Sequence, residues 1–230
     1  MNKQRGFTLI EIAIVLVIIG LLLGGVLKGQ ELITSARVRN MITQQDGIKA
    51  AYFGFVDRYR ALPGDYSQAK ANINLTTVDG NGNGQIESAA TGSGVATEDI
   101  AVWEHLSRSG FITGTYTHSA TYKTESAPAN PYTKFLMMRY DNDYSDSGTT
   151  AAVRHNLRTG NQVPSDILAE VDRKVDDGNP KTGSFRFSKL TADGTSGAPD
   201  ETKCVNATAT PVVWNVIGSV ELNCGGTSLY

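Results

Sequence analysis

The sequence has little net charge, only three histidines and no recognisable catalytic motif. It contains 21 Lys and Arg against 23 Asp and Glu, which gives a formal net charge of −2 at pH 7. This balance predicts no general attraction to nucleic acid. The three histidines, His105, His118 and His155, are scattered, and none belongs to an H-E-x-x-H or nucleophile-elbow motif. These absences disfavour both an enzyme and a nucleic-acid-binding protein.

Cysteine is also scarce. Cys204 and Cys224 are the only two cysteines, both lie near the C-terminus, and they lack C-x-x-C spacing. We predict that they form one disulfide bond in an oxidising compartment. Closing a loop of about 20 residues contributes roughly 3 kcal/mol when the stabilisation is ascribed to chain entropy. The alternative interpretation is two unrelated buried thiols.

The sequence has one long apolar run, and a single acid interrupts it. The run extends from Phe7 to Leu27, about the 20 residues that a helix needs to span a bilayer. Glu11 lies near its beginning. A bare carboxylate inside a bilayer costs about 2.5–3.5 kcal/mol on insertion scales, so such an acid indicates a function. We therefore expect Glu11 to have a specific partner.

Processing of the N-terminus could supply that partner. The six residues before the run carry two cations and no acid, which is typical of a cytoplasmic flank. A secretory peptidase cuts after the apolar core and removes it, whereas a cut between Gly6 and Phe7 keeps the helix and creates a new α-amine. This amine is largely cationic near neutral pH. It would neutralise Glu11 of a neighbouring subunit in a staggered helical stack, which is an assembly device.

The segment Arg5-Gly6-Phe7-Thr8-Leu9-Ile10-Glu11 resembles the class III leader junction of type IV pilins and type II secretion pseudopilins. Residues 12–27 resemble the N-terminal helix of the same family. The resemblance implies that a membrane aspartyl peptidase cuts after Gly6 and methylates Phe7. It also implies that Glu11 orders the subunits during filament assembly. The junction Leu62-Pro63-Gly64-Asp65 resembles a subgroup of pilin-like proteins with larger head domains.

The resemblance and the hydrophobic pattern divide the chain into four parts. These are a cleaved leader (1–6), a transmembrane and filament-core helix (7–27), an amphipathic spine helix (28–62) and a globular head domain (63–230). The spine is predicted from apolar residues at three- and four-residue steps, with Tyr52, Phe55 and Tyr59 in the core. Proline and glycine at Pro63-Gly64 end the helix.

Shorter elements follow in the head. We predict helices at Glu98–Ser109 and Ser165–Asp177, each of which is followed by glycine. Strands are predicted where aromatic and β-branched residues gather, at Lys134–Tyr140, Ser184–Leu190, Val212–Gly218 and Val220–Asn223. A long helix followed by strands and short helices predicts a pilin-like α+β fold, in which the helix packs on an antiparallel sheet.

The segment from Asp79 to Glu87 has the spacing of a calcium loop of EF-hand type. Oxygen-bearing side chains occupy its first, third, fifth and ninth positions and glycine the sixth. The candidate ligands are Asp79, Asn81, Asn83, Gln85 through its backbone carbonyl, and Glu87. Position twelve is Ala90 instead of a bidentate glutamate. We therefore expect a weak site, suited to millimolar calcium, unless Glu98 or Asp99 completes it. An asparagine-glycine turn in a surface loop explains the same residues.

A second acidic segment contains Asp141, Asp143 and Asp146. It could bind a second cation, but we interpret it as a solvated loop.

The hypothesis that these features favour is a structural subunit and not an enzyme. It would be inserted in the bacterial inner membrane with its N-terminus in the cytoplasm, and prepilin peptidase and methyltransferase would process it. An inner-membrane assembly platform would then polymerise it with copies of itself, in the periplasm or as a surface filament. The alternatives are a pseudopilin of type II secretion and a minor adhesive subunit at a filament tip. The size of the head and the C-terminal cysteine pair favour the pilin.

Overall fold

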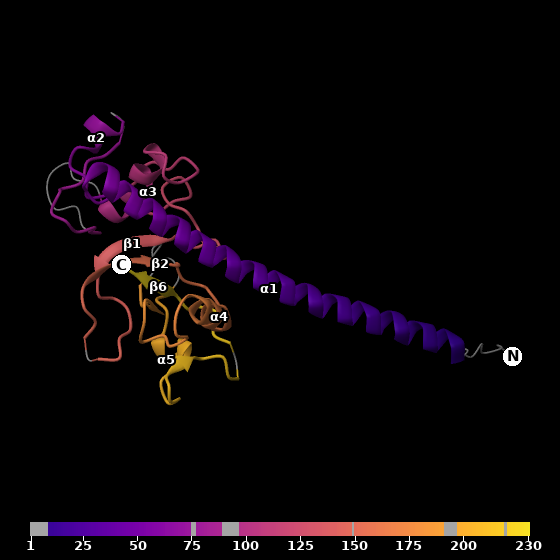
Figure 1. The fold of residues 1–230 in the computed structure, drawn as a ribbon. Helices are drawn as coiled ribbons and strands as arrows, with labels where there is room; N and C mark the ends of the chain where they lie inside the picture. Colours follow the sequence, from indigo (N-terminus) through magenta and orange to yellow (C-terminus); the bar gives the residue numbers. More distant parts are fainter. Residues whose placement is uncertain (1–8, 75–76, 89–96, 149, 191–196, 219) are drawn as a thin grey trace. The chain divides into compact units, whose positions relative to one another are not determined.

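A long N-terminal helix is the first element of the computed structural model, which describes residues 9–74, 77–88, 97–148, 150–190, 197–218 and 220–230 (Figure 1). This helix, α1, runs from Leu9 to Tyr59 without a break. Contacts between residues divide the chain into two units, Met1–Arg37 and Val38–Tyr230. Each unit therefore contains a part of α1.

In the first unit, α1 exposes its apolar side chains. Every Leu, Ile and Val from Leu9 to Leu27 is exposed, and Leu9 keeps 88% of its surface accessible. By length and composition the helix could cross a membrane, since an 18-residue window has a mean hydropathy of 2.8. A Cβ built at Gly20, Gly24 or Gly25 would meet nothing within 4 Å. Small residues of this kind let the backbone of another helix approach closely.

α1 ends at Tyr59, close to the stop that Pro63 and Gly64 predict. Gly64 has a φ of +90°, a conformation that L side chains rarely adopt. A Cβ at this position would lie 2.5 Å from the backbone oxygen of Glu98 in α3 (Glu98–Arg108). Glycine is therefore required at this position, and the turn after α1 packs against the first turn of α3.

The second unit contains a four-stranded antiparallel sheet. Its strands are β1 (Met137–Asp141), β2 (Arg154–Arg158), β3 (Phe185–Phe187) and β6 (Gly226–Leu229), in the order β1-β2-β6-β3. In the central strand, Ser228 pairs with Leu157 on one side and with Phe185 on the other. A separate hairpin joins β4 (Val205–Asn206) and β5 (Val213–Trp214).

Two clusters of buried side chains form the core of this unit. In the first, Val38 and Met41 of α1 join α4 (Ser165–Val175), Phe185 and Trp214. In the second, Ile48 and later residues of α1 join α3 and β1. Of the two short helices, α2 (Ala69–Asn72) and α5 (Glu201–Cys204), α5 contributes Cys204 to the first cluster. α1 therefore provides apolar side chains to both clusters, as an amphipathic spine does.

Most of the predicted architecture is confirmed. The chain is an α+β protein with a pilin-like arrangement of a long helix, an antiparallel sheet and short helices. The helix predicted at Glu98–Ser109 ends one residue earlier, and the helix predicted at Ser165–Asp177 ends two residues earlier. Tyr52 and Phe55 are buried, and Tyr59 packs against them at the edge of the core. Cys204 and Cys224 form a disulfide bond.

The strand predictions were less accurate. The strand expected at Val220–Asn223 is wrong, because the described residues of that stretch are irregular and the strand forms later, at Gly226–Leu229. Strand β1 begins later than predicted, and the strand expected at Val212–Gly218 is only two residues long. Strand β2 was missed, because its residues Arg-His-Asn-Leu-Arg lack the usual pattern of a strand.

The interpretation of the second acidic segment as a solvated loop is wrong for its first acid. Asp141 belongs to β1 and pairs with the buried guanidinium of Arg158. Asp146 pairs with Arg186. Both carboxylates are therefore paired with arginines, but Asp146 stays partly exposed, with 26% of its side-chain surface accessible.

Candidate functional site

The N-terminal segment of the chain contains the residues that the sequence analysis assigns to processing and assembly. Gly6 and Phe7 lie outside the described residues. Glu11 is exposed and lies in the first turn of α1, where an acid interacts favourably with the helix dipole. Its neighbours Ile10 and Ile12 keep 66% and 48% of their surface accessible. An exposed apolar surface of this length is typical of a segment that binds a membrane or other protein chains.

The second candidate site is the loop of residues 79–87, and Asp65 organises it. Each carboxylate oxygen of Asp65 accepts a backbone hydrogen bond, one from Asn83 (2.9 Å) and one from Gly84 (2.8 Å). The backbone oxygen of Asp65 accepts a third from Gly82 (2.9 Å). Asp65 is only 4% exposed. The sequence did not indicate this role, because Asp65 precedes the loop by 14 positions and turn chemistry already accounted for it.

Glu98, the first residue of α3, closes the loop from the other side. Its carboxylate accepts hydrogen bonds from the backbone of Asn81 (2.8 Å) and Glu87 (3.1 Å). Burial, together with the smaller effect of the charges of Asp65 and Glu87, raises the pKa of Glu98 from 4.5 to about 7. The adjacent Asp99 does not reach the loop, since its carboxylate binds Arg139 at 3.1 Å.

The structure brings together only some of the predicted calcium ligands. The side-chain amides of Asn81 and Asn83 both donate to the same carboxylate oxygen of Glu87, at 3.2 and 2.8 Å. Asp79 instead accepts a hydrogen bond from the backbone of Lys70 and forms an ion pair with its side chain. Gln85 is exposed, and its backbone donates to the Asn83 side chain. The loop therefore gathers Asn81, Asn83 and Glu87 and turns Asp79 toward α2.

His105 fixes the entrance of this loop. It is fully buried in α3, its Nδ1 accepts the N–H of Gly64 at 3.0 Å, and its Nε2 lies 2.7 Å from the backbone oxygen of Val78. Because Nδ1 is an acceptor, Nε2 carries the proton and donates to Val78. Burial lowers the pKa of His105 to about 4. His105 therefore links the turn after α1 to the loop.

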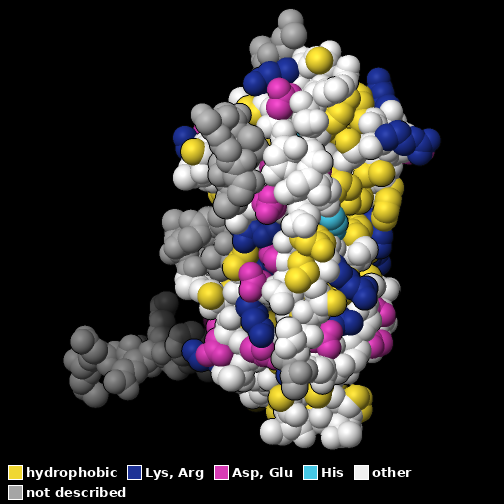
Figure 2. All heavy atoms as spheres, turned by 90° about the vertical axis from the view of Figure 1, so that its left-hand side faces the viewer, with side chains coloured by type: hydrophobic (Ala, Val, Ile, Leu, Met, Phe, Trp, Pro, Cys, Tyr) yellow, Lys and Arg dark blue, Asp and Glu magenta, His cyan; other side chains and the backbone are white. Residues whose placement is uncertain are grey.

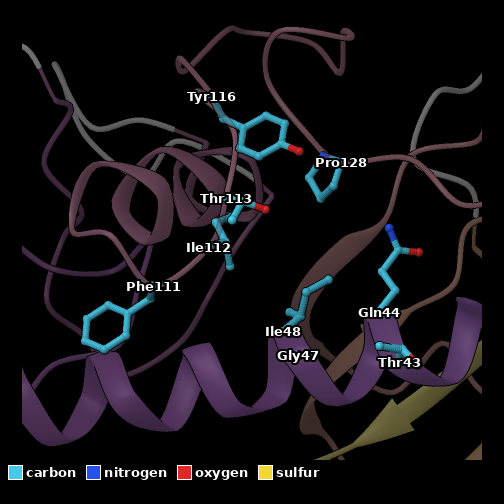
Figure 3. A pocket seen from close by; sticks show the side chains of 9 residues that line it. All are labelled: Thr43, Gln44, Gly47, Ile48, Phe111, Ile112, Thr113, Tyr116 and Pro128. Carbon is cyan, nitrogen blue, oxygen red and sulfur yellow. The ribbon is translucent and has the colours of Figure 1, made fainter.

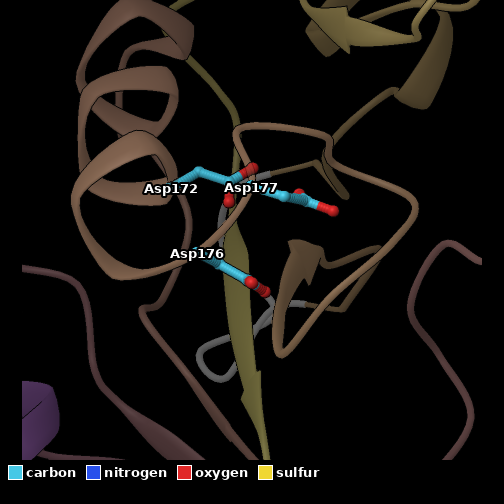
Figure 4. Close-up of side chains that lie close together, drawn as sticks. All are labelled: Asp172, Asp176 and Asp177. Carbon is cyan, nitrogen blue, oxygen red and sulfur yellow. The ribbon is translucent and has the colours of Figure 1, made fainter.

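A third group of acids lies at the end of α4 (Figure 4). Oxygen atoms of Asp172, Asp176 and Asp177 lie within 4.8 Å of one another. Asp172 accepts the indole N–H of Trp214 at 2.7 Å, and Asp177 accepts the backbone N–H of Asn179 at 2.8 Å. Asp176 accepts backbone hydrogen bonds from the segment that leads into β3. These acids therefore terminate α4 and fix the chain that follows it.

A shallow groove of about 310 Å³ lies beside α1 in the second unit (Figure 3). Its lining has no charged residue and includes Gln44 and Gly47 of α1, and Phe111 and Tyr116 after α3. Figure 2 shows one face of the molecule, on which Lys and Arg side chains lie among Asp and Glu side chains. Such interleaving gives no field of one sign on that face.

Comparison with known proteins identifies the N-terminal segment. Residues 1–27 match the family described as prokaryotic N-terminal methylation motif. No curated protein and no solved structure is similar enough to match the chain. The match covers the leader, the expected cleavage point, Glu11 and the whole apolar run. The chain therefore carries the class III signal of type IV pilins and pseudopilins.

Proposed function

We propose that the protein is a structural subunit of a type IV pilus-like filament. The observation that carries this proposal is the methylation motif on a helix whose apolar side chains are all exposed from Leu9 to Leu27. The motif implies processing by a prepilin peptidase and assembly into a pilus. Cleavage after Gly6 and methylation of Phe7 would leave this helix as the new N-terminus. The protein would wait in the inner membrane before assembly.

Burial of the apolar helix would drive polymerisation. Fully burying one Leu, Ile or Val side chain contributes roughly 1.5–3 kcal/mol. A few such side chains outweigh the cost of about 2.5–3.5 kcal/mol for one carboxylate at the centre of a bilayer. A second copy of the chain would supply an apolar helix that covers the exposed side chains. It would also supply the α-amine of Phe7, which would pair with Glu11. Self-association would therefore bury the apolar surface and pair the Glu11 carboxylate at the same time.

The decisive experiment compares Glu11→Ala with Glu31→Ala. Glu31 lies on the same helix beyond the apolar run and makes an exposed ion pair with Lys28 at 2.7 Å, a contact worth little. We expect both variants to reach the membrane at the wild-type level. Only Glu11→Ala should lose filaments in the sheared fraction, by at least about tenfold, the factor that corresponds to about 1.4 kcal/mol. Normal filament yield from Glu11→Ala would refute the role of this acid in assembly.

Microscopy of the same cells separates the alternatives. Long surface fibres favour the pilin, whereas a short periplasmic structure and loss of enzyme export on deletion favour the secretion pseudopilin. A tip adhesin would be scarce relative to a shaft subunit in a filament preparation. The disulfide between Cys204 and Cys224 supports the pilin, because it bounds a C-terminal region as in the family that the sequence resembles.

We propose in addition that the loop of residues 79–87 takes a calcium ion. The carboxylates of Asp65, Glu87 and Glu98 interact repulsively around this loop, and a divalent cation would relieve that repulsion. Asn81 and Asn83 would supply neutral oxygens. Calorimetric titration of the full chain should show binding in the millimolar range that Glu87→Gln weakens. The absence of heat at millimolar calcium would leave the loop as a hydrogen-bonded turn.

A further inference from the structure

The loop of residues 79–87 contains both Asn-Gly steps of the chain, Asn81-Gly82 and Asn83-Gly84. An Asn-Gly step is prone to deamidation, because glycine has no side chain to hinder attack by its own backbone nitrogen. That nitrogen loses its proton and bonds to the Asn side-chain carbonyl carbon, and the side-chain nitrogen leaves as ammonia. Water then opens the cyclic imide and gives aspartate or isoaspartate. Asn83 is exposed, so solvent can reach it.

In the folded loop, the attacking nitrogen of the second step is engaged. The N–H of Gly84 donates to a carboxylate oxygen of Asp65 at 2.8 Å. A hydrogen bond to a carboxylate is stronger than one to a neutral acceptor, and it holds the proton that the reaction must remove. The first step has a different acceptor, because the N–H of Gly82 donates to the backbone oxygen of Asp65 at 2.9 Å.

The reacting side chain of Asn83 is also held at both ends. Its oxygen accepts the N–H of Gln85, and its nitrogen donates to Glu87, both at 2.8 Å. Asp65 itself is fixed, because the loop lies directly against it. A Cβ built at Gly80 would lie 2.3 Å from the backbone carbon of Asp65.

We propose that Asn83 is a latent deamidation site and that the carboxylate of Asp65 keeps it unreacted. Loss of the bond from Gly84 frees the attacking nitrogen. The reaction then converts the neutral amide into an acid beside Asp65, Glu87 and Glu98. Hydrolysis of the imide does not regenerate asparagine. The fraction of molecules that carry the extra negative charge in the loop therefore grows with the time that the Gly84–Asp65 hydrogen bond is broken. This inference does not depend on the filament proposal.

The test uses Asp65→Ala and Asp65→Asn in the full chain, solubilised in mild detergent at mildly alkaline pH with a chelator present. Both variants keep the backbone oxygen that binds Gly82. Incubation in ¹⁸O-water labels each new acid, and peptide mass spectrometry measures the rates at Asn81 and Asn83 separately. Asp57→Ala is the matched control, since Asp57 is exposed and pairs with Arg60. A synthetic peptide of residues 79–87 gives the unprotected rate.

We expect Asp65→Ala to accelerate deamidation of Asn83 by roughly 10- to 100-fold, the factor for one hydrogen bond to a charged group. Asn81 should change much less, and Asp57→Ala should match the wild type. If Asp65→Ala does not fold, judged by circular dichroism, Asp65→Asn gives the same comparison. Its amide has one acceptor oxygen and no charge, so the bond from Gly84 is either lost or weakened to a bond with a neutral acceptor, and both changes accelerate Asn83. The proposal is overturned if wild-type Asn83 reacts as fast as the peptide, if both variants react like the wild type, or if Asn81 and Asn83 accelerate equally.

Discussion

Replacing Glu98 by glutamine should remove a pH dependence of stability that the loop imposes on the protein. Burial raises the pKa of Glu98 from 4.5 to about 7, so the folded state binds this proton more tightly than the unfolded state. The stabilisation is complete below about pH 4.5 and is lost as the pH rises through about 7. Glutamine stays neutral, and its variant should lack this decline.

The expected magnitude follows from the two pKa values. The difference between about 7 and 4.5 corresponds to about 3 kcal/mol of unfolding free energy between mildly acidic and mildly alkaline pH. A small domain has a total stability of about 5–15 kcal/mol, so the change is measurable. Glutamine keeps one acceptor oxygen and loses the other, which removes the hydrogen bond of either Asn81 or Glu87. The variant should therefore be less stable than the wild type at low pH and similar to it at high pH.

Urea unfolding of the full chain in mild detergent, followed by circular dichroism from pH 5 to 8, measures this effect. His105 and Asp172 also titrate, but they are common to both proteins and cancel in the difference. Glu125→Gln is the control, since Glu125 is exposed. Calcium should flatten the wild-type decline if it binds the ionised carboxylates. An equal pH dependence in Glu98→Gln and the wild type would refute the reasoning.

Two further substitutions test the packing of the second unit. Gly226→Ala should destabilise it by about 1–3 kcal/mol, because a Cβ at Gly226 would lie 2.3 Å from the ring of Phe185 in β3. Thermal melts measure this loss. Gly47→Ala is the control, since a Cβ at Gly47 meets nothing within 4 Å. Trp214→Phe should lower the free energy of unfolding by roughly 1.5–3 kcal/mol, because the hydrogen bond from the indole to Asp172 is lost. Trp103→Phe is the control, since the Trp103 indole nitrogen has no hydrogen-bond partner among the described residues. Urea midpoints at neutral pH compare the stability of the two tryptophan variants, and equal losses of stability in both would contradict the role of the hydrogen bond.

The sequence predicts the helices well because their signals are local. Apolar periodicity, caps and the glycines after each helix all act within a few residues. The strands depend on distant partners. The two charged or polar residues Asn156 and Arg158 of β2 are buried because Asp141, on another strand, binds both of them. Gly226 can occupy a central strand because it has no side chain to clash with the ring of Phe185, a residue about 40 positions earlier in the sequence. Neither relation can be read from the segment itself.

The loop of residues 79–87 shows the same limit for a site. Its spacing was visible in the sequence, and the suggestion that Glu98 could complete it is consistent with the two hydrogen bonds that this carboxylate accepts. The role of Asp65 was not visible, because it depends on the turn at Gly64 that packs against α3. Asp79 was expected to point into the loop, but Lys70 lies close enough to bind it. Spacing gives the order of candidate ligands, and competing partners decide where each side chain points.

The two units satisfy their unfavourable groups in different ways. In the second unit, several buried acids and cations meet partners within the same chain: Arg158 meets Asp141, Asp99 meets Arg139, and Asp172 meets Trp214. Among the residues that the structure describes, nothing covers the apolar side chains of residues 9–27 in this way, since all of them are exposed. Leaving such a surface in water is costly, so its burial must come from lipid or from other molecules. Under the proposed function, the N-terminal motif marks this segment for processing and assembly, and copies of the same helix would then replace the lipid as the surface that covers it.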